Sequence, residues 1–321
     1  MITVPPGSSP PASDDLFEAE RPRLTGLAYR MLGTVADAED VVQDAWFRWH
    51  ARRDGEVDRP EAWLTTVTTR IALDHLRTAR RRREAYVGPW LPEPLVAEAG
   101  PAEAAEVAES LRLGFLTVLD QLEPVERAVF LLADVFAVPF AEIALTIGKS
   151  EGACRQIASR ARRRVRPGTG PERSATRGPV GSGPAPASAG RHRTERSAAD
   201  RAVVDRLMMA VALGDVEVAL RCLAPGVVCV SDGGASTRAA RRPVVGADRV
   251  VRLLVNLSRR YAGRLTARPA SINGDVGSVV SVDGTVDMVT AFELVDDRVV
   301  TIRIVRNPDK LTHVDGPPLV R

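Results

Sequence analysis

Lysine is almost absent from this sequence, because only Lys149 and Lys310 among its 44 basic residues are not arginine. Cysteine is also scarce: Cys154, Cys222 and Cys229 are odd in number and lack the paired C-x-x-C spacing of zinc sites. This argues against a structural metal and for a reduced, cytosolic protein. No run of 18 apolar residues occurs, and the first residues have neither a basic nor an apolar leader region. We therefore expect a cytoplasmic protein that neither spans a membrane nor carries a cofactor.

The length of 321 residues predicts two or three domains. Helical patterns run from about Leu16 to Arg83 and from about Ala102 to Arg166. The stretch 167–199 has Val180 as its single aliphatic residue larger than alanine and has no aromatic residue. Such a segment buries too little surface to offset its ordering entropy, so we predict a flexible tether.

After the tether the pattern changes to that of an α+β domain. Helical segments are predicted at about 199–213, 215–223 and 247–260. The β-rich runs are 227–231, 265–271, 276–282, 286–295 and 298–305. The last four are separated by the turn pairs Asn273-Gly274, Asp283-Gly284 and Asp296-Asp297, which favour hairpins. We therefore predict an antiparallel sheet in this domain.

An acidic stripe is predicted on the helix that Thr34 can cap. Apolar residues repeat there at helical spacing and form the buried side, namely Ala38, Val41, Val42, Ala45, Trp46 and Trp49. Asp37, Asp40 and Asp44 share another side. The stripe is either a solvated face or a surface that docks on a basic partner.

A strongly basic helix is predicted over 63–83, where Leu64, Val67, Ile71 and Ala79 can pack inward. The remaining surface carries Arg70, Asp74, His75, Arg77 and Arg80 to Arg83. This composition suits phosphate neutralisation, although a charge run can also serve only solubility. We interpret His75 as a surface or capping residue, because no set of metal ligands surrounds it.

Residues 124–166 have the spacing of a helix-turn-helix. Pro124 fits the first turn of one helix, a second runs from about Pro139 to Ile147, Gly148 ends it, and Ser150 can cap a third. Ala153, Ile157 and Ala161 are predicted to pack inward. The residues then offered to a major groove are Glu151, Arg155, Gln156, Ser159, Arg160 and Arg163, whereas Arg162, Arg164 and Arg166 suit phosphates. The alternative is an ordinary three-helix bundle with a basic end.

Taken together, the motifs resemble those of an extracytoplasmic-function sigma factor over roughly residues 14–166. The resemblance rests on their order: D-A-E-D-x-x-Q-D at 37–44, P-E-A-W-L at 60–64, L-D-H-L-R at 73–77, F-A-E-I-A at 140–144 and S-E-G-A-x-R-Q at 150–156. It implies a promoter-specific transcription initiation factor that binds RNA polymerase core through the β′ clamp helices and the β flap. One departure is Arg70, where many members carry asparagine.

The resemblance also implies roles for single residues. Core binding falls on Asp37, Asp40, Gln43 and Asp44. Recognition of the −10 element, with a flipped base on the non-template strand, falls on Arg70, Asp74, His75, Arg77, Arg80 and Arg81. Recognition of the −35 element falls on Ser150, Glu151, Arg155, Gln156, Ser159, Arg160 and Arg163.

The remainder resembles a subgroup of these factors with a fused SnoaL-like domain, a cone-shaped α+β fold with a curved sheet. W-L-P-E-P-L at 90–95 and N-P-D-K-L at 307–311 match its motifs, whereas D-G-G-G-K is altered to D-G-G-A-S at 232–236. Ser236 stands where the motif has a lysine, and its side chain cannot supply the positive charge of that lysine. The implied organisation is a disordered N-terminus (1–13), sigma region 2 (14–84), a linker (85–101), sigma region 4 (102–166), a tether (167–199) and a SnoaL-like regulatory domain (200–321).

The linker Y-V-G-P-W-L-P-E-P-L at 86–95 is unusually apolar. Its prolines favour an extended polyproline II geometry that holds Trp90 and Leu91 out for a partner. We predict that it docks the C-terminal domain and thereby regulates the factor in cis; the alternative is that Trp90 packs on its own helices. The predicted regulatory contacts are Trp90, Leu91, Pro92, Asp232, Gly233, Gly234, Asn307, Pro308, Asp309 and Lys310.

Two other functions stay open at this point. A helix-turn-helix regulator with a ligand-sensing domain explains residues 124–166 but leaves the acidic stripe and the basic helix unexplained. An enzymatic C-terminal domain could use Asp232, Asp287, Glu293 or Tyr261, yet no paired set among them predicts opposed pKa values. We therefore expect no catalysis, and a small ligand in this domain is the more plausible addition.

Overall fold

The computed structural model describes residues 12–52, 57–97, 110–165 and 189–314. Its contacts divide the chain into two compact units. The helical unit consists mainly of residues 1–81 and 122–162, and the mixed unit consists of 82–121 and 163–319. Residues 82–121, which include the predicted linker, cluster with the C-terminal part of the chain.

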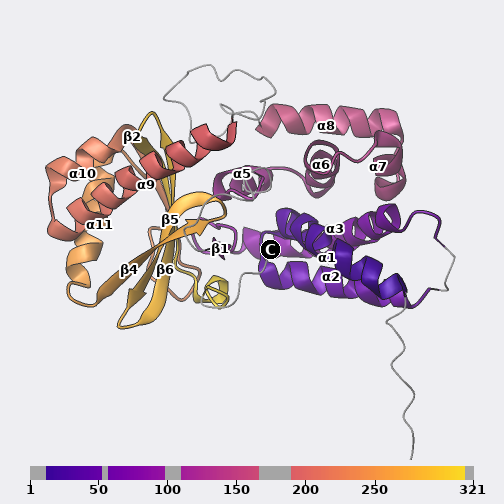
Figure 1. The fold of residues 1–321 in the computed structure, drawn as a ribbon, viewed down its shortest axis with the longest axis horizontal. Helices are drawn as coiled ribbons and strands as arrows, with labels where there is room; N and C mark the ends of the chain where they lie inside the picture. Colours follow the sequence, from indigo (N-terminus) through magenta and orange to yellow (C-terminus); the bar gives the residue numbers. More distant parts are fainter. Residues whose placement is uncertain (1–11, 53–56, 98–109, 166–188, 315–321) are drawn as a thin grey trace, which may run out of the picture. The chain divides into compact units, whose positions relative to one another are not determined.

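The helical unit is built from helices alone in its described part (Figure 1). In chain order these are α1 (Ala12–Leu32), α2 (Val35–His50), α3 (Pro60–Glu84), α6 (Pro124–Phe130), the π-helical turn η1 (Leu131–Val135), α7 (Phe140–Ile147) and α8 (Glu151–Val165). The buried side chains include Phe17, Leu24 and Leu27 of α1 and Leu64 of α3, each fully buried. Apolar side chains at helical spacing thus drive the packing of this unit.

The predicted helix-turn-helix forms between α6 and α8. Gly148 ends α7 in the left-handed conformation with φ of 72°, which glycine adopts without strain. Ser150 Oγ then accepts a hydrogen bond of 3.2 Å from the backbone N–H of Ala153, so Ser150 caps α8. The packed side of α8 differs in detail: Cys154, Ile157, Ala158 and Ala161 are buried, whereas Ala153 is only half-buried.

The mixed unit contains a seven-stranded sheet in the order β1-β4-β5-β6-β7-β2-β3. The bounds are β1 (Val96–Ala97), β2 (Leu223–Asp232), β3 (Val244–Val245), β4 (Leu265–Ile272), β5 (Asp275–Val282), β6 (Thr285–Val295) and β7 (Arg298–Val305). All three predicted turn pairs join neighbouring strands, with positive φ at every one of their residues. The antiparallel prediction holds for β4 to β7, but β2 lies parallel to β7, so the sheet is mixed.

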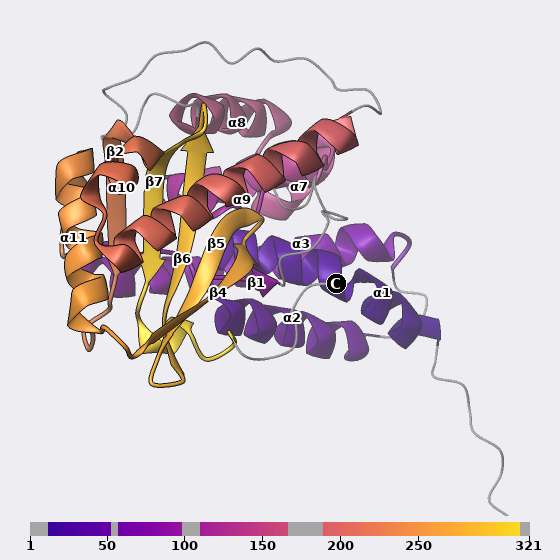
Figure 2. The ribbon, with the colours of Figure 1, turned by 60° about the vertical axis from the view of Figure 1, so that its left-hand side comes forward.

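Three helices cover one face of this sheet: α9 (Ala189–Leu213), α10 (Val216–Cys222) and α11 (Ala247–Arg260) (Figures 1 and 2). Their apolar side chains share one core with the strands, including Leu207, Val251 and Ile302. Helix α9 begins at Ala189, inside the segment predicted to be a flexible tether. Residues 191–200 contain neither proline nor glycine, which permits the helix to extend; residues 167–188 of the predicted tether lie outside the described part of the chain.

The segment before α6 packs on the other face of the sheet. Helix α5 (Leu113–Leu119) places Leu113 against Ala270, Val279 and Ala291, which alternate along their strands with residues of the helix-covered core. Strand β1 adds to the sheet edge beside β4. The region predicted to begin the second DNA-binding domain therefore contributes α5 to the mixed unit.

One residue, Asn273, binds the backbone at two points that precede α5, Leu95 and Leu111. Its backbone N–H donates to Leu95 O and its side-chain Oδ1 accepts from Leu95 N, both at 2.8 Å, while Nδ2 donates to Leu111 O at 2.9 Å. Asn273 is 3% exposed, so these bonds are shielded from water.

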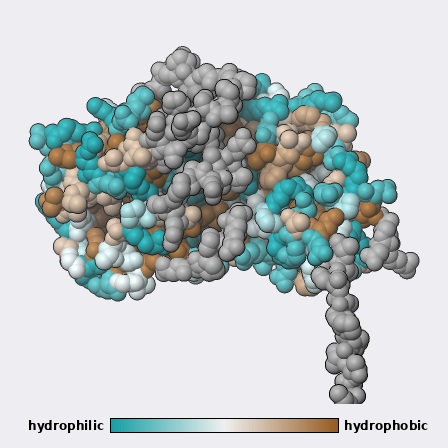
Figure 3. All heavy atoms as spheres, viewed as in Figure 1, coloured by the Kyte–Doolittle hydropathy of each residue, from teal (hydrophilic) through white to brown (hydrophobic). Residues whose placement is uncertain are grey.

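The surface mixes hydrophilic and hydrophobic residues on the face shown in Figure 3. Within the described ranges, no helix is both long and apolar enough to cross a membrane. The same residues contain no group of three or more His, Cys, Asp or Glu side chains that could hold a metal ion.

Candidate functional site

The acidic stripe lies on α2. Asp40, Gln43 and Asp44 are exposed, and Asp37 is half-buried and accepts a hydrogen bond of 2.5 Å from Thr34 Oγ1. The buried side of the helix is as predicted, with the exception that Trp46 is only half-buried.

Phe47, which sequence reasoning missed, continues this stripe with a side chain that is 55% exposed. Its ring lies 5.2 Å from that of Trp46 in an edge-on arrangement. The exposed face of α2 thus combines negative charge with one apolar ring.

Some arginines of the basic helix α3 bind groups of the protein itself and so are not free to bind phosphate. Asp74 and Arg77 are exposed and pair with each other at 2.9 Å, and His75 is half-buried. Arg80 and Arg81 belong to the helix, but their side chains lie outside the described part of the structure. Arg70 makes a different contact altogether.

A polar contact joins the first half of α3 to α7. Arg70 Nε donates to Thr146 O at 3.0 Å, and its Nη2 donates to Leu145 O at 2.8 Å. The hydroxyl groups of Thr66 and Thr146 lie 2.9 Å apart. We call these bonds the α3–α7 contact; through them Arg70 binds two of the carbonyl groups that the end of α7 leaves without helical partners.

Two further interactions, one of them buried, add to the packing of the helical unit. Arg59 pairs with Glu142 of α7 at 2.8 Å, and Arg127 donates a buried hydrogen bond of 2.6 Å to Met31 O. The sequence contained no signal for these long-range pairs, because each arginine was equally suited to solvent or phosphate.

The outer side of α8 carries most of the residues predicted to face DNA. Arg155, Gln156, Ser159, Arg160 and Arg163 are exposed, and so is Ser150. Glu151 is half-buried and pairs with Arg155 at 2.6 Å.

Two of the three arginines assigned to phosphates are described at the end of α8. Arg162 forms a bidentate pair with Asp134 of η1, while Arg164 is exposed. Arg166 lies outside the described residues. Arg162 thus anchors α8 to the preceding helices.

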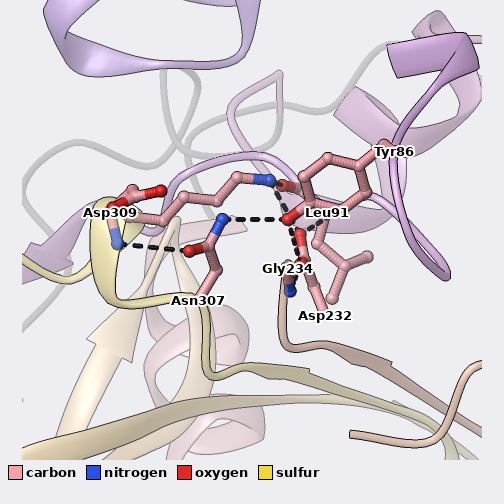
Figure 4. A network of polar contacts seen from close by, with 7 residues as sticks. Tyr86, Leu91, Asp232, Gly234, Asn307 and Asp309 are labelled. Carbon is pink, nitrogen blue, oxygen red and sulfur yellow. Dashed lines mark hydrogen bonds and ion pairs between the residues drawn. The ribbon is translucent and has the colours of Figure 1, made fainter. Parts of the chain in front are cut away.

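The mixed unit contains a buried polar network around Asp232 (Figure 4). Asp232 ends β2 and is fully buried. Its Oδ2 accepts from Leu91 N at 2.8 Å and from Lys310 Nζ at 2.7 Å. Lys310 Nζ also donates to Leu91 O at 2.5 Å, so both polar groups of the Leu91 backbone are bound.

Tyr86 and Asn307 complete this network. Tyr86 OH donates to Asp232 Oδ1 at 2.5 Å, and Asn307 Nδ2 donates to Tyr86 OH at 2.9 Å. We call Tyr86, Leu91, Asp232, Asn307 and Lys310 the linker clasp. It brings together the three motifs at 90–95, 232–234 and 307–311; Tyr86, which precedes the first of them, was not among the predicted site residues.

Gly234 is shaped for the linker clasp. Its φ is 60°, its N–H donates to Asp232 Oδ1 at 3.1 Å, and a Cβ there would lie 2.8 Å from Asn307 Cγ. Gly233 is equally constrained, because a Cβ would meet Thr237 O at 2.5 Å. Both glycines allow an approach that no other residue permits.

The linker itself is buried on this surface. Leu91 is 1% exposed and packs with Val228, Val230 and Val305, and Pro92 is also buried. Trp90 is half-buried; Lys310 Nζ lies 4.1 Å from its ring centroid and Arg83 Cζ lies 3.6 Å from it. Cation–π attraction thus adds to the ion pair and the apolar contacts.

Burial governs the titration of the linker clasp. It lowers the pKa of Lys310 to about 8, although the neighbouring Asp232 carboxylate opposes the shift. It also raises the pKa of Tyr86, and the hydrogen bond to Asp232 acts in the same direction. The ion pair is therefore held against a considerable cost of desolvation.

The altered motif falls outside the linker clasp. Ala235 and Ser236 are exposed, and so are Pro308 and Asp309 of the 3-10 helix η2 (Pro308–Lys310). The buried cation opposite Asp232 comes from Lys310, so the loss of a lysine at position 236 leaves this ion pair in place.

The four candidates for catalysis are all engaged with basic residues. Asp232 pairs with Lys310, Asp287 with Arg306 at 2.7 Å, and Glu293 with Arg303 at 3.0 Å. Tyr261 OH accepts a long bond of 3.5 Å from Arg306. None of these groups is arranged as an acid–base pair.

The same face of the sheet that holds α5 carries a second buried charge. Asp275 is 8% exposed and lies 3.3 Å from Arg112 Nε, and burial raises its pKa to about 6. Arg303 Nη2 lies 3.0 Å from the position of a Cβ at Gly114 of α5. Sequence reasoning missed these residues because nothing local marks them as neighbours.

Comparison with known proteins now adds to this geometry. The family described as "Sigma-70 region 2" matches residues 16–82, and "Sigma-70, region 4" matches 112–165. The ECF RNA polymerase sigma factor SigJ of Mycobacterium tuberculosis is 41% identical over 315 residues, covering 94% of this chain and 93% of the relative. The chain belongs to the extracytoplasmic-function (ECF) sigma factor family.

Two further comparisons extend this assignment within the ECF family. The probable sigma factor SigI of M. tuberculosis is 31% identical over 300 residues, covering 92% of this chain and 93% of the relative. The crystal structure of M. tuberculosis SigJ superimposes with a TM-score of 0.70 at 37% identity, covering 93% of this chain and 98% of that one. The fold is therefore that of two helical sigma regions followed by a SnoaL-like domain.

The ECF assignment also decides between the functions that the sequence left open. A regulator with a single helix-turn-helix does not explain a match to both sigma regions. The protein is an ECF RNA polymerase sigma factor, and its two sigma regions are those used in promoter recognition.

Proposed function

We propose that this sigma factor is regulated in cis by its C-terminal domain, which holds the linker through the linker clasp. The observation that carries the proposal is the buried Lys310–Asp232 pair, which binds both polar groups of the Leu91 backbone. Burying a charged pair carries a considerable desolvation cost, which a segment that serves only as a soluble spacer would avoid.

The position of the linker explains how the C-terminal domain would act. The linker and the start of sigma region 4 both lie in residues 82–121, and a factor that recognises two promoter elements needs its two sigma regions at a set separation. The linker clasp and the contact of α5 with the sheet restrain this segment at two places. Release of either would lengthen the reach between the regions.

Within the proposal, the acidic stripe of α2 binds the β′ clamp helices of core polymerase and region 4 meets the β flap. Helix α3 recognises the −10 element and α8 the −35 element. The exposure of Asp40, Asp44, Arg155 and Gln156 supports these roles. We infer a cytosolic factor without catalytic chemistry of its own, supported by the ion pairing of every candidate carboxylate.

The contacts of Arg70 indicate that the helical unit has a second arrangement, in which α3 is bound to α7 and not to DNA. Its guanidinium cannot bind the carbonyl groups of α7 and a promoter base at the same time. The α3–α7 contact therefore supports a resting arrangement of the helical unit that opens when α3 engages DNA.

Core binding is tested with single charge reversals on α2. Asp44→Lys should abolish recruitment of purified core polymerase, since it opposes a basic docking surface. Glu39→Lys is the matched control, because Glu39 is also exposed on α2 but is not part of the stripe. Equal loss, or no loss, in both variants contradicts the proposed interface.

Regulation in cis is tested by run-off transcription from one promoter class. The full chain is compared with versions ending near Arg166 and just before Asn307, and with the double variant Trp90→Ala, Pro94→Ala. We expect the altered proteins to differ from the full chain in transcript yield at equal core binding. If all four behave alike, regulation through the linker is wrong.

A further inference from the structure

One exposed side of α11 is almost entirely basic. Arg249, Arg252 and Arg259 are exposed, and Asn256 lies between them. Positions three, seven and ten residues apart return to nearly the same side of an α-helix, so these residues form one stripe about 15 Å long. We call the three arginines the α11 arginine row.

The α11 arginine row lacks acidic partners, whereas several other arginines on helices of this protein have one. Arg21 of α1, Arg77 of α3, Arg155 of α8 and Arg221 of α10 each pair with a carboxylate on the same helix. Among the residues that the structure describes, no ion pair or side-chain hydrogen bond forms at Arg249, Arg252 or Arg259. Asp248 is the one acidic residue of α11, and it forms no such pair either.

The α11 arginine row stabilises its own helix only at one end. Arg259 lies in the last turn of α11, where the helix dipole favours a cation, whereas Arg249 lies in the first turn, where the dipole disfavours one. Arginines repeated along one side of a helix repel one another. A face kept only for solubility gains more from mixed charges, so the unpaired row favours an anionic partner.

We propose that the α11 arginine row binds backbone phosphates of promoter duplex DNA. Planar guanidinium groups bind phosphates in a bidentate manner, and a straight row of them follows a phosphate backbone better than it fits a compact anion. The inference rests on the proposed function, in which the linker clasp tethers the C-terminal domain to the segment that precedes a promoter-recognising region. The domain then adds to promoter affinity without adding sequence specificity.

The test replaces the whole row with glutamine: Arg249→Gln, Arg252→Gln and Arg259→Gln together. The control removes three exposed arginines elsewhere in the same unit, Arg221→Gln, Arg264→Gln and Arg298→Gln, so that the net charge changes equally. Binding of each full-length protein to a labelled duplex is measured by anisotropy over a salt series. Each phosphate contact contributes about 0.9 to the slope of log K against log salt, so the row variant should lose roughly 2 to 3 from this slope.

Hydroxyl-radical footprints of the holoenzyme complete the test. We expect protection beyond the −10 and −35 elements that disappears in the row variant and persists in the control. An unchanged slope and footprint in the row variant overturns the inference. So does a row variant that binds DNA normally but fails to bind core polymerase, because the partner is then an acidic protein. Absence of −10 and −35 protection in the unaltered holoenzyme counts against the proposed function, whereas the anisotropy series still decides the role of the row.

Discussion

The linker clasp and the α3–α7 contact hold the chain together in physically different ways. In the linker clasp, Asp232 and Lys310 are 0% and 6% exposed, and the bonds form between side chains and a buried backbone. In the α3–α7 contact, Arg70 is exposed and binds carbonyl groups beside Leu145, which is 74% exposed. Breaking the first leaves a charge in a dry interior, whereas breaking the second lets water replace the bonds of the exposed Arg70 guanidinium. The linker clasp is therefore suited to a lasting hold and the α3–α7 contact to repeated opening.

The largest effect is expected from Lys310→Met. This change leaves the Asp232 carboxylate buried without its cation, which should lower the free energy of unfolding by about 3–5 kcal/mol. Urea denaturation of the full chain, followed by fluorescence of the tryptophans, measures the change.

Asp309→Asn is the control for Lys310→Met, because Asp309 occupies the same turn but is exposed. It should change stability by less than about 0.5 kcal/mol. A Lys310→Met protein as stable as this control would mean that the linker clasp is no stronger than a surface ion pair.

The pH dependence of stability tests the same contrast with a smaller effect. The pKa of Lys310 is about 8 in the folded protein, below its ordinary value of 10.5. Below pH 8 the lysine is charged in both states and the folded state bears the desolvation cost. Between pH 8 and 10.5 the folded state loses the proton first, so stability should rise with pH, by at most about 3 kcal/mol.

Lys310→Met provides the reference for this pH series, because its unfolding lacks the contribution of this group. The difference between the two proteins should therefore change across pH 8 to 10.5. A difference that stays constant would show that Lys310 titrates normally and that water reaches the linker clasp.

Gly234→Ala should destabilise the linker clasp by about 1–3 kcal/mol. The added Cβ would lie 2.8 Å from Asn307 Cγ, and the φ of 60° is strained for alanine. Thermal unfolding measures the loss.

Gly263→Ala separates the two causes. Gly263 has a φ of 75°, and no heavy atom lies within 4 Å of the position that an added Cβ would occupy, so alanine there meets backbone strain alone. Equal decreases in stability in both variants would mean that the Asn307 side chain moves away from the added Cβ without a cost in free energy.

The smallest effect is expected from Arg70→Ala, about 1 kcal/mol or less, because water can replace the bonds of an exposed guanidinium. The change should instead raise the rate of hydrogen exchange in α7. Arg77→Ala, which removes an exposed arginine that pairs within α3, is the control and should leave α7 unchanged. Strong destabilisation by Arg70→Ala would place this contact in the same class as the linker clasp.

Local signals in the sequence predicted much of the fold. The turn pairs at Asn273, Asp283 and Asp296 located the hairpins, since positive φ favours these residue types. The cap at Ser150 and the break at Gly148 located the helix-turn-helix. Such features depend on a few adjacent residues, which is why they can be read before the fold is known.

Long-range neighbours could not be predicted in the same way. The parallel pairing of β2 with β7 depends on how the chain crosses over, and Arg70 had no local sign that α7 would approach it. The linker motifs identified Leu91, Asp232 and Lys310, yet Tyr86 joined them only through the fold. The sequence shows which residues of a segment can form hydrogen bonds or ion pairs, but it does not show which distant residues will be their partners.

Asn273 has a consequence for the design of altered proteins. One side chain binds the backbone at Leu95 and at Leu111, so the spacing of these two points does not depend on how many residues join them. Doubling the joining segment costs only about 0.6 kcal/mol of closure entropy. A reporter peptide or a protease site inserted between Leu95 and Leu111 should leave the thermal unfolding of the mixed unit nearly unchanged. Such an insertion could then be used to monitor the state of the linker.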